Sequence, residues 1–311
     1  MIPKAHITAW RSRAPWLLDA QVEQDLIICR AIVELFRVPE IANSLVFRGG
    51  TALYKLYLDP PARYSEDIDL VQARPEPIGH TLDRARTVLD PWLGAPRRLL
   101  REGRVSLVYR FDSEDAPPLK LRLKVEINTR EHFTELGVVR VPFRVDNPWY
   151  TGAADVATYA LDELLCTKLR ALYQRRKGRD LFDLWHALEL GRLDPKVLLA
   201  CLQRYLAEEG RTVTRAQFEE NLAGKRNDPD FRNDMGPLLR PGFAWDFEAA
   251  LDAVLQKLVA LLAGEPWKGT VDQSLRGAIQ KGIDQADDGQ LLDGPEVMNE
   301  LRRVIQRRRQ S

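Results

Sequence analysis

The sequence has 311 residues, with 46 Lys and Arg against 45 Asp and Glu, so its formal net charge is +1. This balance excludes a uniformly basic nucleic-acid-binding protein but allows local basic clusters. No apolar run reaches the roughly 18 residues of a transmembrane helix, and the charged N-terminus precedes no apolar secretory segment. Three widely spaced cysteines predict reduced thiols in a cytoplasmic protein and argue against a zinc site: Cys29, Cys166 and Cys201.

The first part of the sequence predicts helices and strands in alternation. An apolar stripe with a helical period predicts a helix over 19–37, with Asp19 as its N-cap. The elements expected next are a strand at 44–48, a helix at 52–56 capped by Thr51, a turn and strand within 63–71, a helix at about 78–93, and strands at 105–111 and 119–127. The last strand alternates most clearly, because its odd positions are apolar and its even positions are charged.

The second part of the sequence predicts helices only. Residues 142–153 contain Asn-Pro and Thr-Gly pairs and are expected to connect two parts of the protein. Helices are expected at 157–176, 180–190, 195–208, 215–222, 246–263 and 294–309, with an acidic loop at 284–294. We therefore predict an α/β domain over residues 1–155, followed by an all-helical domain over residues 156–311.

Two aspartates in one predicted strand are the first candidate for chemistry. Asp67 and Asp69 are two positions apart, so their carboxylates share one face while Ile68 and Leu70 occupy the other. Carboxylates about 7 Å apart on a strand repel each other, and Mg²⁺ with its preference for oxygen ligands is a natural cation between them. An isolated pair of this kind is more often a solvated strand face. Neighbouring motifs are therefore needed to choose between a solvated face and a metal site.

Two neighbouring features supply that context. Gly49 and Gly50 lie at a strand-to-helix junction, where backbone N–H groups can bind phosphate oxygens, although Gly-Gly also marks ordinary tight turns. Glu126 lies on the charged face of the strand at 119–127 and, unless it is a plain surface residue, can supply a third carboxylate. Two-metal phosphoryl transfer uses such a set.

Basic residues in the helical part are the remaining candidates. Lys168 falls within the apolar stripe of its helix, so its side chain must extend to solvent, pair with an acid or reach into a cleft. In a cleft, it would be well placed to bind a triphosphate. Asp180 and Asp183 share a face of the next helix, where Asp180 can also act as a favourable N-terminal charge. The basic cluster that includes Arg175, Arg176 and Lys177 suits an RNA backbone, as do those within 97–110 and 302–309, although each can equally be a solvated surface.

The ordered motifs resemble those of the AbiEii/AbiGii-like (MenT-like) nucleotidyltransferase toxins. The resemblance rests on Phe-Arg-Gly-Gly-Thr-Ala-Leu-Tyr-Lys at 47–55 and Arg-Tyr-Ser-Glu-Asp-Ile-Asp-Leu at 63–70. Lys-Val-Glu-Ile at 124–127 is similar to the strand with the third carboxylate, and segments 163–172 and 179–184 are similar to later motifs. The likeness spans about residues 8–190 and is more specific as an ordered set than in any single motif.

This resemblance implies a DNA-polymerase-β-type nucleotidyltransferase core, with a mixed sheet flanked by helices and followed by helices. It implies Mg²⁺-dependent transfer from an NTP, with Mn²⁺ as an alternative ion, to an RNA acceptor such as the 3′ end of tRNA, which blocks translation. It also implies a partner antitoxin, as in abortive-infection and type IV toxin–antitoxin systems, and no membrane association.

The resemblance also assigns roles to residues. Asp67, Asp69 and Glu126 would hold the metal, and Lys168 with Asp180 would contact the nucleotide or assist transfer. Gly49, Gly50 and Ser65 would line the phosphate site, and Ser65 is also the position that some antitoxins would modify. The sequence has Gly-Gly-Thr where the usual signature has Gly-Ser, so hydroxyl contacts to phosphate would come from Thr51 or Ser65.

Three alternatives stay open at the level of sequence. The same site could transfer a nucleotide to a small molecule or a protein hydroxyl, or the fold could serve as a non-catalytic RNA- or protein-binding module. A metal-dependent nuclease is disfavoured, because such sites usually have a lysine two residues after the acid, whereas Asn128 follows Glu126.

Overall fold

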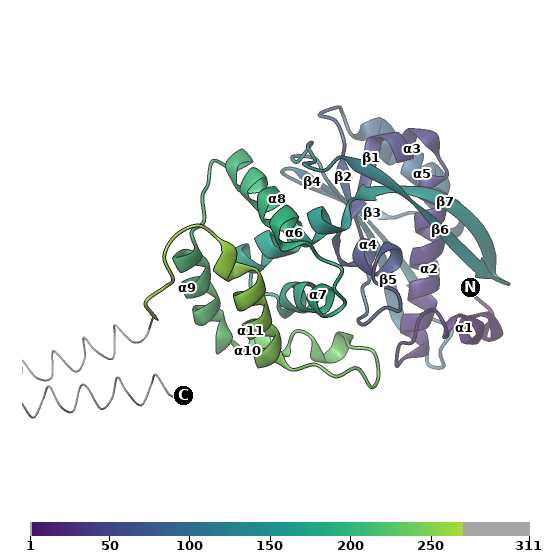
Figure 1. The fold of residues 1–311 in the computed structure, drawn as a ribbon. Helices are drawn as coiled ribbons and strands as arrows, with labels where there is room; N and C mark the ends of the chain where they lie inside the picture. Colours follow the sequence, from purple (N-terminus) through teal and green to yellow (C-terminus); the bar gives the residue numbers. More distant parts are fainter. Residues whose placement is uncertain (1, 270–311) are drawn as a thin grey trace, which may run out of the picture. The chain divides into compact units, whose positions relative to one another are not determined.

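The computed structural model describes residues 2–269 (Figure 1). Residues 1–263 form one compact unit, and the rest of the chain is assigned to a second unit, of which only 264–269 are described. The acidic loop expected at 284–294, the helix expected at 294–309 and the basic cluster at 302–309 therefore lie outside the described residues.

A mixed seven-stranded sheet organises the first half of the chain. Its spatial order is β3-β4-β5-β2-β1-β7-β6, and the β2–β5 and β1–β7 pairs are parallel while the others are antiparallel. The strands are β1 (Leu45–Arg48), β2 (Asp67–Gln72), β3 (Arg97–Arg101), β4 (Arg104–Asp112), β5 (Lys120–Asn128), β6 (Val138–Asn147) and β7 (Tyr150–Tyr159).

Helices precede, interrupt and follow these strands. The first five are α1 (Lys4–Trp10), α2 (Asp19–Phe36), α3 (Pro39–Ser44), α4 (Gly49–Leu56) and α5 (Gly79–Leu93). After the sheet come α6 (Leu161–Gln174), α7 (Gly178–Glu189), α8 (Pro195–Glu208), α9 (Arg215–Arg226), α10 (Pro229–Asn233) and α11 (Phe247–Lys257), with short 3₁₀ turns at Gly236–Leu238 and Val259–Leu261. The predicted mixed sheet flanked by helices and followed by helices is confirmed.

The apolar face of the sheet packs against α2 and α5 (Figure 1). The alternation predicted for the strand at 119–127 is confirmed, because Leu123, Val125 and Ile127 of β5 are fully buried. Burial of each such side chain contributes about 1.5–3 kcal/mol. A second apolar core joins α6, α7, α8, α9 and α11 to Leu53 and Tyr54 of α4.

One expected connection is a pair of strands instead. Residues 142–153 fall within the β6–β7 hairpin, whose register runs from Val138↔Tyr159 to Asn147↔Tyr150. Pro142 is tolerated because β6 is the last strand in the sheet order, where a missing N–H costs no pairing on the outer side. The expected helix at 157–176 accordingly begins only at Leu161, because β7 continues to Tyr159.

Two expected helix caps also differ from the structure. Leu18 is the N-cap of α2, and Asp19 is its first residue, paired with Arg11. Arg48 is the N-cap of α4, and the Thr51 hydroxyl is used elsewhere. The sequence patterns did not predict α1, α3 and β3, which are short elements stabilised by contacts with the helices and strands beside them.

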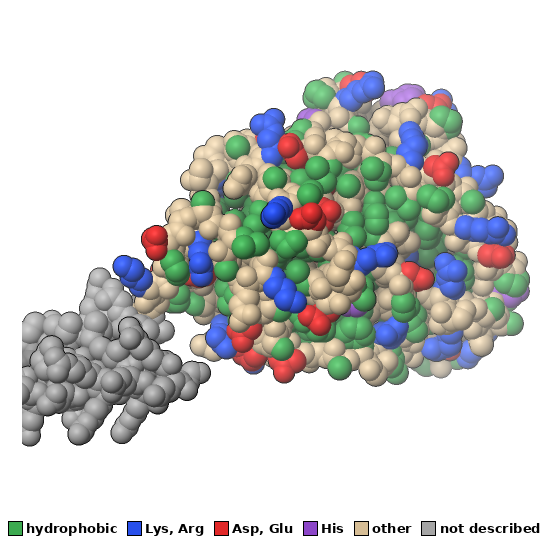
Figure 2. Space-filling view, in the orientation of Figure 1, with side chains coloured by type: hydrophobic (Ala, Val, Ile, Leu, Met, Phe, Trp, Pro, Cys, Tyr) green, Lys and Arg blue, Asp and Glu red, His purple; other side chains and the backbone are tan. Residues whose placement is uncertain are grey.

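The surface charges and the reduced state of the cysteines agree with what the composition predicts. The face drawn in Figure 2 mixes basic and acidic side chains, as the near-zero net charge predicts. All three cysteines are buried free thiols. Between residues 2 and 269, no helix is both long enough and apolar enough to cross a membrane.

Candidate active site

Strands β2 and β5 gather acidic and basic side chains on one face of the sheet. Asp67 pairs in register with Lys124, and Asp69 pairs with Glu126, so in these parallel strands the four side chains point to the same side. The side chains of β2 that point the other way, such as Ile68, are buried in the apolar core. The two aspartates therefore lie on the polar face that the alternation predicts.

Both aspartates are held in an environment that disfavours their charge. Burial, reinforced by the neighbouring Asp69, raises the pKa of Asp67 to about 6. Burial also raises the pKa of Asp69, against the opposing effect of the Arg48 charge. One oxygen of Asp67, Oδ1, is buried without a hydrogen-bond partner in the described structure. A buried, unpartnered carboxylate oxygen beside a second carboxylate fits a hard cation such as Mg²⁺.

The two glycines bring the backbone against this acidic pair. β1 ends at Arg48, which lies opposite Asp69, and Gly49 then begins α4 with a φ of +83°. A Cβ on Gly49 would lie 2.4 Å from Asp69 Oδ2, and a Cβ on Gly50 would lie 2.3 Å from Arg63 Nη2. Only glycine permits both approaches. The first turn of α4, with its free backbone N–H groups, is thus placed beside the carboxylates.

The two hydroxyl residues fix this junction to β2. Thr51 is buried and donates a 2.5 Å hydrogen bond to the carbonyl oxygen of Asp67. Its Oγ1 also lies 2.8 Å from Ser65 Oγ. Because the Thr51 proton goes to Asp67, Ser65 donates to Thr51. Thr51 therefore orients the strand that carries Asp67 and does not present its hydroxyl to a phosphate, whereas Ser65 is only half-buried.

Lys168 is paired with acids, which is one of the three outcomes open from the sequence. Its Nζ lies 2.8 Å from Asp183 Oδ2 and 3.2 Å from Asp180 Oδ1, and the side chain is 8% exposed. Lys168 nevertheless lowers the pKa of Asp69, so its charge acts on the candidate metal site. The lysine is therefore held beside the carboxylates by α7.

Asp180 lies between two basic side chains, and its part in nucleotide contact or transfer stays a prediction. Its side chain is fully buried, and both oxygens accept hydrogen bonds from Arg175, at 2.7 and 2.9 Å. The Arg175 side chain itself is 54% exposed. Asp180 thus holds Lys168 on one side and an accessible guanidinium on the other.

Glu126 is committed to basic partners. It forms ion pairs with Lys124 and with Arg104, the latter at 3.1 Å, and accepts a long bond from Ser106 at 3.4 Å. Throughout residues 2–269, no group of three or more His, Cys, Asp or Glu side chains is arranged as metal ligands would be. Asp67 and Asp69 are accordingly the two carboxylates best placed for a cation, and the role of Glu126 as a third ligand stays a prediction.

The basic cluster expected to bind RNA is largely neutralised. Arg175 is held by Asp180, Arg176 lies 3.2 Å from Asp228, and Lys177 lies 3.8 Å from Asp234. The sequence between 167 and 179 contains no acid, so the prediction could not include acids supplied by other elements. Residues 175–177 consequently offer less net positive charge than their sequence indicates.

The sequence analysis missed Arg48 and Arg63 as site residues. Arg48 lies beside Asp69 and is anchored by Glu131, which also binds Arg170 at 2.6 Å. Arg63 is buried and donates two hydrogen bonds to Asp183, at 2.6 and 2.8 Å. Both lie within the motifs at 47–55 and 63–70, and a charged residue directly before Gly-Gly is the signal that could have identified Arg48.

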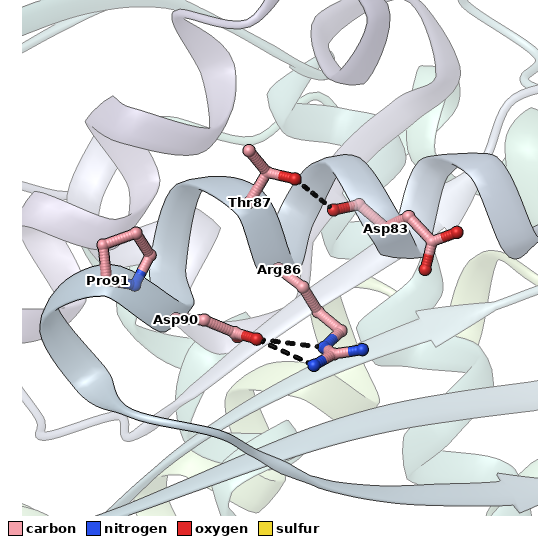
Figure 3. A pocket seen from close by; sticks show the side chains of 5 residues that line it. All are labelled: Asp83, Arg86, Thr87, Asp90 and Pro91. Atoms are coloured by element: carbon pink, nitrogen blue, oxygen red, sulfur yellow. Dashed lines mark hydrogen bonds and ion pairs between the residues drawn. The ribbon is translucent and has the colours of Figure 1, made fainter.

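The hollow drawn in Figure 3 is not part of this site. It measures 530 Å³ and is lined by Asp83, Arg86, Thr87, Asp90 and Pro91 of α5. Arg86 pairs with Asp90, which also accepts a 2.9 Å bond from Tyr109 on the apolar face of the sheet. The hollow therefore lies on the α5 side, whereas the two aspartates of β2 point to the other side.

Comparisons with known proteins give one family match and several similar structures. A family model described as nucleotidyl transferase AbiEii toxin, type IV toxin–antitoxin system, matches residues 30–253. The nucleotidyltransferase toxin MenT4 from Mycobacterium tuberculosis is similar over 85% of this chain and 91% of its own, at 19% identity and a TM-score of 0.59. JHP933 from Helicobacter pylori is similar over 85% and 99%, at 19% identity and a TM-score of 0.46. No curated protein sequence matches the chain.

Proposed function

The chain belongs to the AbiEii family of nucleotidyltransferase toxins, and from this premise we propose that it transfers a nucleoside monophosphate from an NTP to the 3′ end of a tRNA. Membership of a toxin–antitoxin family implies a partner antitoxin. The proposed modification would block translation in the cytoplasm, and the antitoxin would counteract it.

One observation carries the proposal. Asp67 and Asp69 are half-buried and share a face of β2, and Asp69 lies against Gly49, the glycine that opens α4. Paired carboxylates beside free backbone N–H groups suit an ion that is bound together with a polyphosphate. Nucleotidyl transfer uses this combination, because the attacking oxygen and the leaving pyrophosphate both carry negative charge.

Each part of the site has a distinct role in the proposed reaction. Asp67 and Asp69 would hold Mg²⁺, with Glu126 as the proposed third ligand. When bound, the ion would lower the pKa of the attacking 3′-hydroxyl and neutralise charge on the leaving pyrophosphate. The first turn of α4 would bind phosphate oxygens, and Ser65 would join it when its hydroxyl turns from Thr51 towards the phosphate. Lys168, fixed by its two aspartates, adds positive potential beside Asp69.

The test is incubation of the 311-residue protein with tRNA and each α-³²P-labelled NTP in turn. We expect the wild type to lengthen tRNA with at least one NTP and Mg²⁺ or Mn²⁺. Asp67→Asn removes a metal-binding charge without a change in shape, so incorporation should fall at least about a hundredfold. Asp146→Asn is the matched control, because Asp146 is an exposed aspartate of β6 with a side chain 73% exposed.

The outcomes separate the proposed function from its alternatives. Full activity of Asp67→Asn would contradict the metal assignment. Shortened RNA would indicate a nuclease, and label on protein or on a small molecule would indicate a different acceptor. Lack of incorporation with every NTP and either ion would indicate a non-catalytic binding module.

A further inference from the structure

The carboxylate pair lies at one end of a larger basic sheet face. In the register of the sheet, the face that carries Asp67 and Asp69 continues across β5, β4 and β3. The charged side chains that these three strands place on it are seven cations and two carboxylates: Arg97, Arg101, Arg104, Arg110, Lys120, Arg122, Lys124, Asp112 and Glu126. We call this surface the β3–β5 face.

The β3–β5 face is open to solvent. Side chains of its cations are 51% exposed at Arg104, 57% at Arg122 and 87% at Lys120. The opposite side of β4 and β5 is buried, because Leu107, Tyr109 and Leu123 pack in the apolar core. At the far end of the face, a hollow of 540 Å³ is lined by Arg110, Lys120 and Arg122 together with Phe111, Asp112 and Leu121.

Much of this positive charge is unpaired. Within the described chain, Arg97, Arg101 and Arg110 form no ion pair, whereas the cations of residues 175–177 all do. Arg122 pairs with Glu66 and Lys120 pairs with Asp112, both on the surface, where such pairs contribute little and can be exchanged for a ligand. The β3–β5 face therefore carries positive charge that a bound polyanion can neutralise.

The dimensions fit a strand of RNA whose end reaches the carboxylates. Along β5, Arg122 is four residues from Glu126, which is a distance of roughly 13 Å. Across the sheet, β3 is the third strand from β2, which is a distance of about 14 Å. These distances exceed the reach of one triphosphate bound at the aspartates. They correspond to about four nucleotides of a stacked strand, at roughly 3.4 Å each.

The chemistry of the face favours RNA over an acidic protein. Leu99 and Val108 are its only apolar side chains on β3 and β4, and both are half-buried. A protein partner usually needs an apolar centre surrounded by polar groups, whereas phosphate contacts need only exposed cations. The aromatic side chains of β4, Tyr109 and Phe111, belong to the opposite side of the sheet, and Phe111 reaches only the hollow at the far end, so base stacking along the face is not expected.

We propose that the β3–β5 face is the docking surface for the acceptor RNA, which it holds by phosphate contacts that do not depend on base identity. This inference rests on the proposed function only for the nature of the acceptor. Binding itself requires no catalysis, so the two can fail separately.

The test measures binding of labelled tRNA to the full-length protein over a range of KCl concentrations. In the variant Arg97→Gln, Arg101→Gln, Arg110→Gln, we expect affinity to fall about tenfold or more near 0.1 M salt. The slope of log K against log salt should flatten by about two, since each lost phosphate contact removes roughly 0.7 from a single-stranded slope. The change should be similar for tRNAs of different sequence.

A control variant removes the same charge elsewhere. Arg13→Gln, Arg84→Gln, Arg211→Gln replaces three exposed arginines away from this face and should leave affinity and slope unchanged. Incorporation gives a second measurement, in which the face variant should raise the KM for tRNA and leave kcat unchanged.

Each result decides the proposal. Equal loss in both triple variants, an unchanged salt slope in the face variant, or no binding of RNA by the wild type would overturn it. Binding of an acidic protein partner that competes for the same arginines, without RNA binding, would also overturn it. Face-dependent RNA binding without any incorporation would support this inference and contradict the proposed function instead.

Discussion

Glu23 is an acid buried in the core of the sheet domain. It lies on α2 and is 1% exposed. Its Oε2 accepts a 2.9 Å bond from the backbone N–H of Glu114, and its Oε1 has no hydrogen-bond partner in the described chain. Burial raises the pKa of Glu23 to about 7. Because the folded protein binds this proton more tightly than the unfolded chain, the free energy of unfolding should decrease as pH rises from about 4.5 to 7.

Glu23→Gln should remove this pH dependence. We expect the variant to exceed the wild type by about 3 kcal/mol in unfolding free energy at pH 8 and to match it near pH 4. Urea denaturation between pH 4 and 8 measures both curves. Glu76→Gln, at an exposed glutamate, is the control and should follow the wild type. Parallel curves for Glu23→Gln and the wild type would contradict the assignment.

Gly49 shows how one residue joins backbone geometry to the site. Its positive φ and its approach to Asp69 both require that no Cβ be present. Gly49→Ala should therefore displace Asp69 and lower the unfolding free energy by about 1–3 kcal/mol. Nucleotide incorporation should fall by more than this loss of folded protein explains. Gly224→Ala, where a Cβ would meet nothing within 4 Å, is the control. Full incorporation by Gly49→Ala would show that the turn tolerates displacement.

At the scale of elements, Asp183 of α7 joins segments that are distant in sequence. It accepts hydrogen bonds from Arg63 before β2, at 2.6 and 2.8 Å, and from Tyr54 of α4, at 3.0 Å. It also pairs with Lys168 of α6, at 2.8 Å. Although burial opposes the shift, Arg63 and Lys168 hold the pKa of Asp183 well below its usual range. Its charge is therefore retained through mildly acidic pH.

Asp183→Asn should destabilise the protein strongly. The substitution keeps the shape but leaves the buried Arg63 without its carboxylate partner and Lys168 with Asp180 alone, so the unfolding free energy should fall by about 3–5 kcal/mol. Tyr54→Phe removes one hydrogen bond from an uncharged donor to the same carboxylate and should cost less, about 1.5–3 kcal/mol. Denaturant titration of both variants tests this order, and equal losses would show that the charge of Asp183 matters little.

The elements also show what sequence can and cannot predict. β5 was predictable because its alternation separates a buried face from a charged one. The β6–β7 hairpin was not, because Pro142 and the Asn-Pro pair are typical of loops, and only the position of β6 at the sheet edge makes them compatible with a strand. The pairing of Lys168 with two aspartates depends on how α6 and α7 pack, which the helical period of each does not specify.

At the scale of the whole molecule, the sheet separates two environments. Helices α2 and α5 cover the apolar side, and the other side of β2 to β5 carries the carboxylates and the basic face. The candidate aspartates and glycines were predictable from local patterns. Their juxtaposition was not, because β2 pairs in parallel with β5, which is separated from it in sequence by a helix and two strands.

The position of β3 at the end of the sheet order has a further consequence for solubility. Unpaired backbone groups along an edge strand can recruit a second copy of the same chain and start aggregation. Charged side chains on β3, namely Arg97, Arg98 and Arg101, oppose such self-association by mutual repulsion, and Pro142 protects β6 at the opposite edge. Arg97 and Arg101, which we assign to RNA, should thus also oppose aggregation, and their replacement should make the protein aggregate sooner at high concentration.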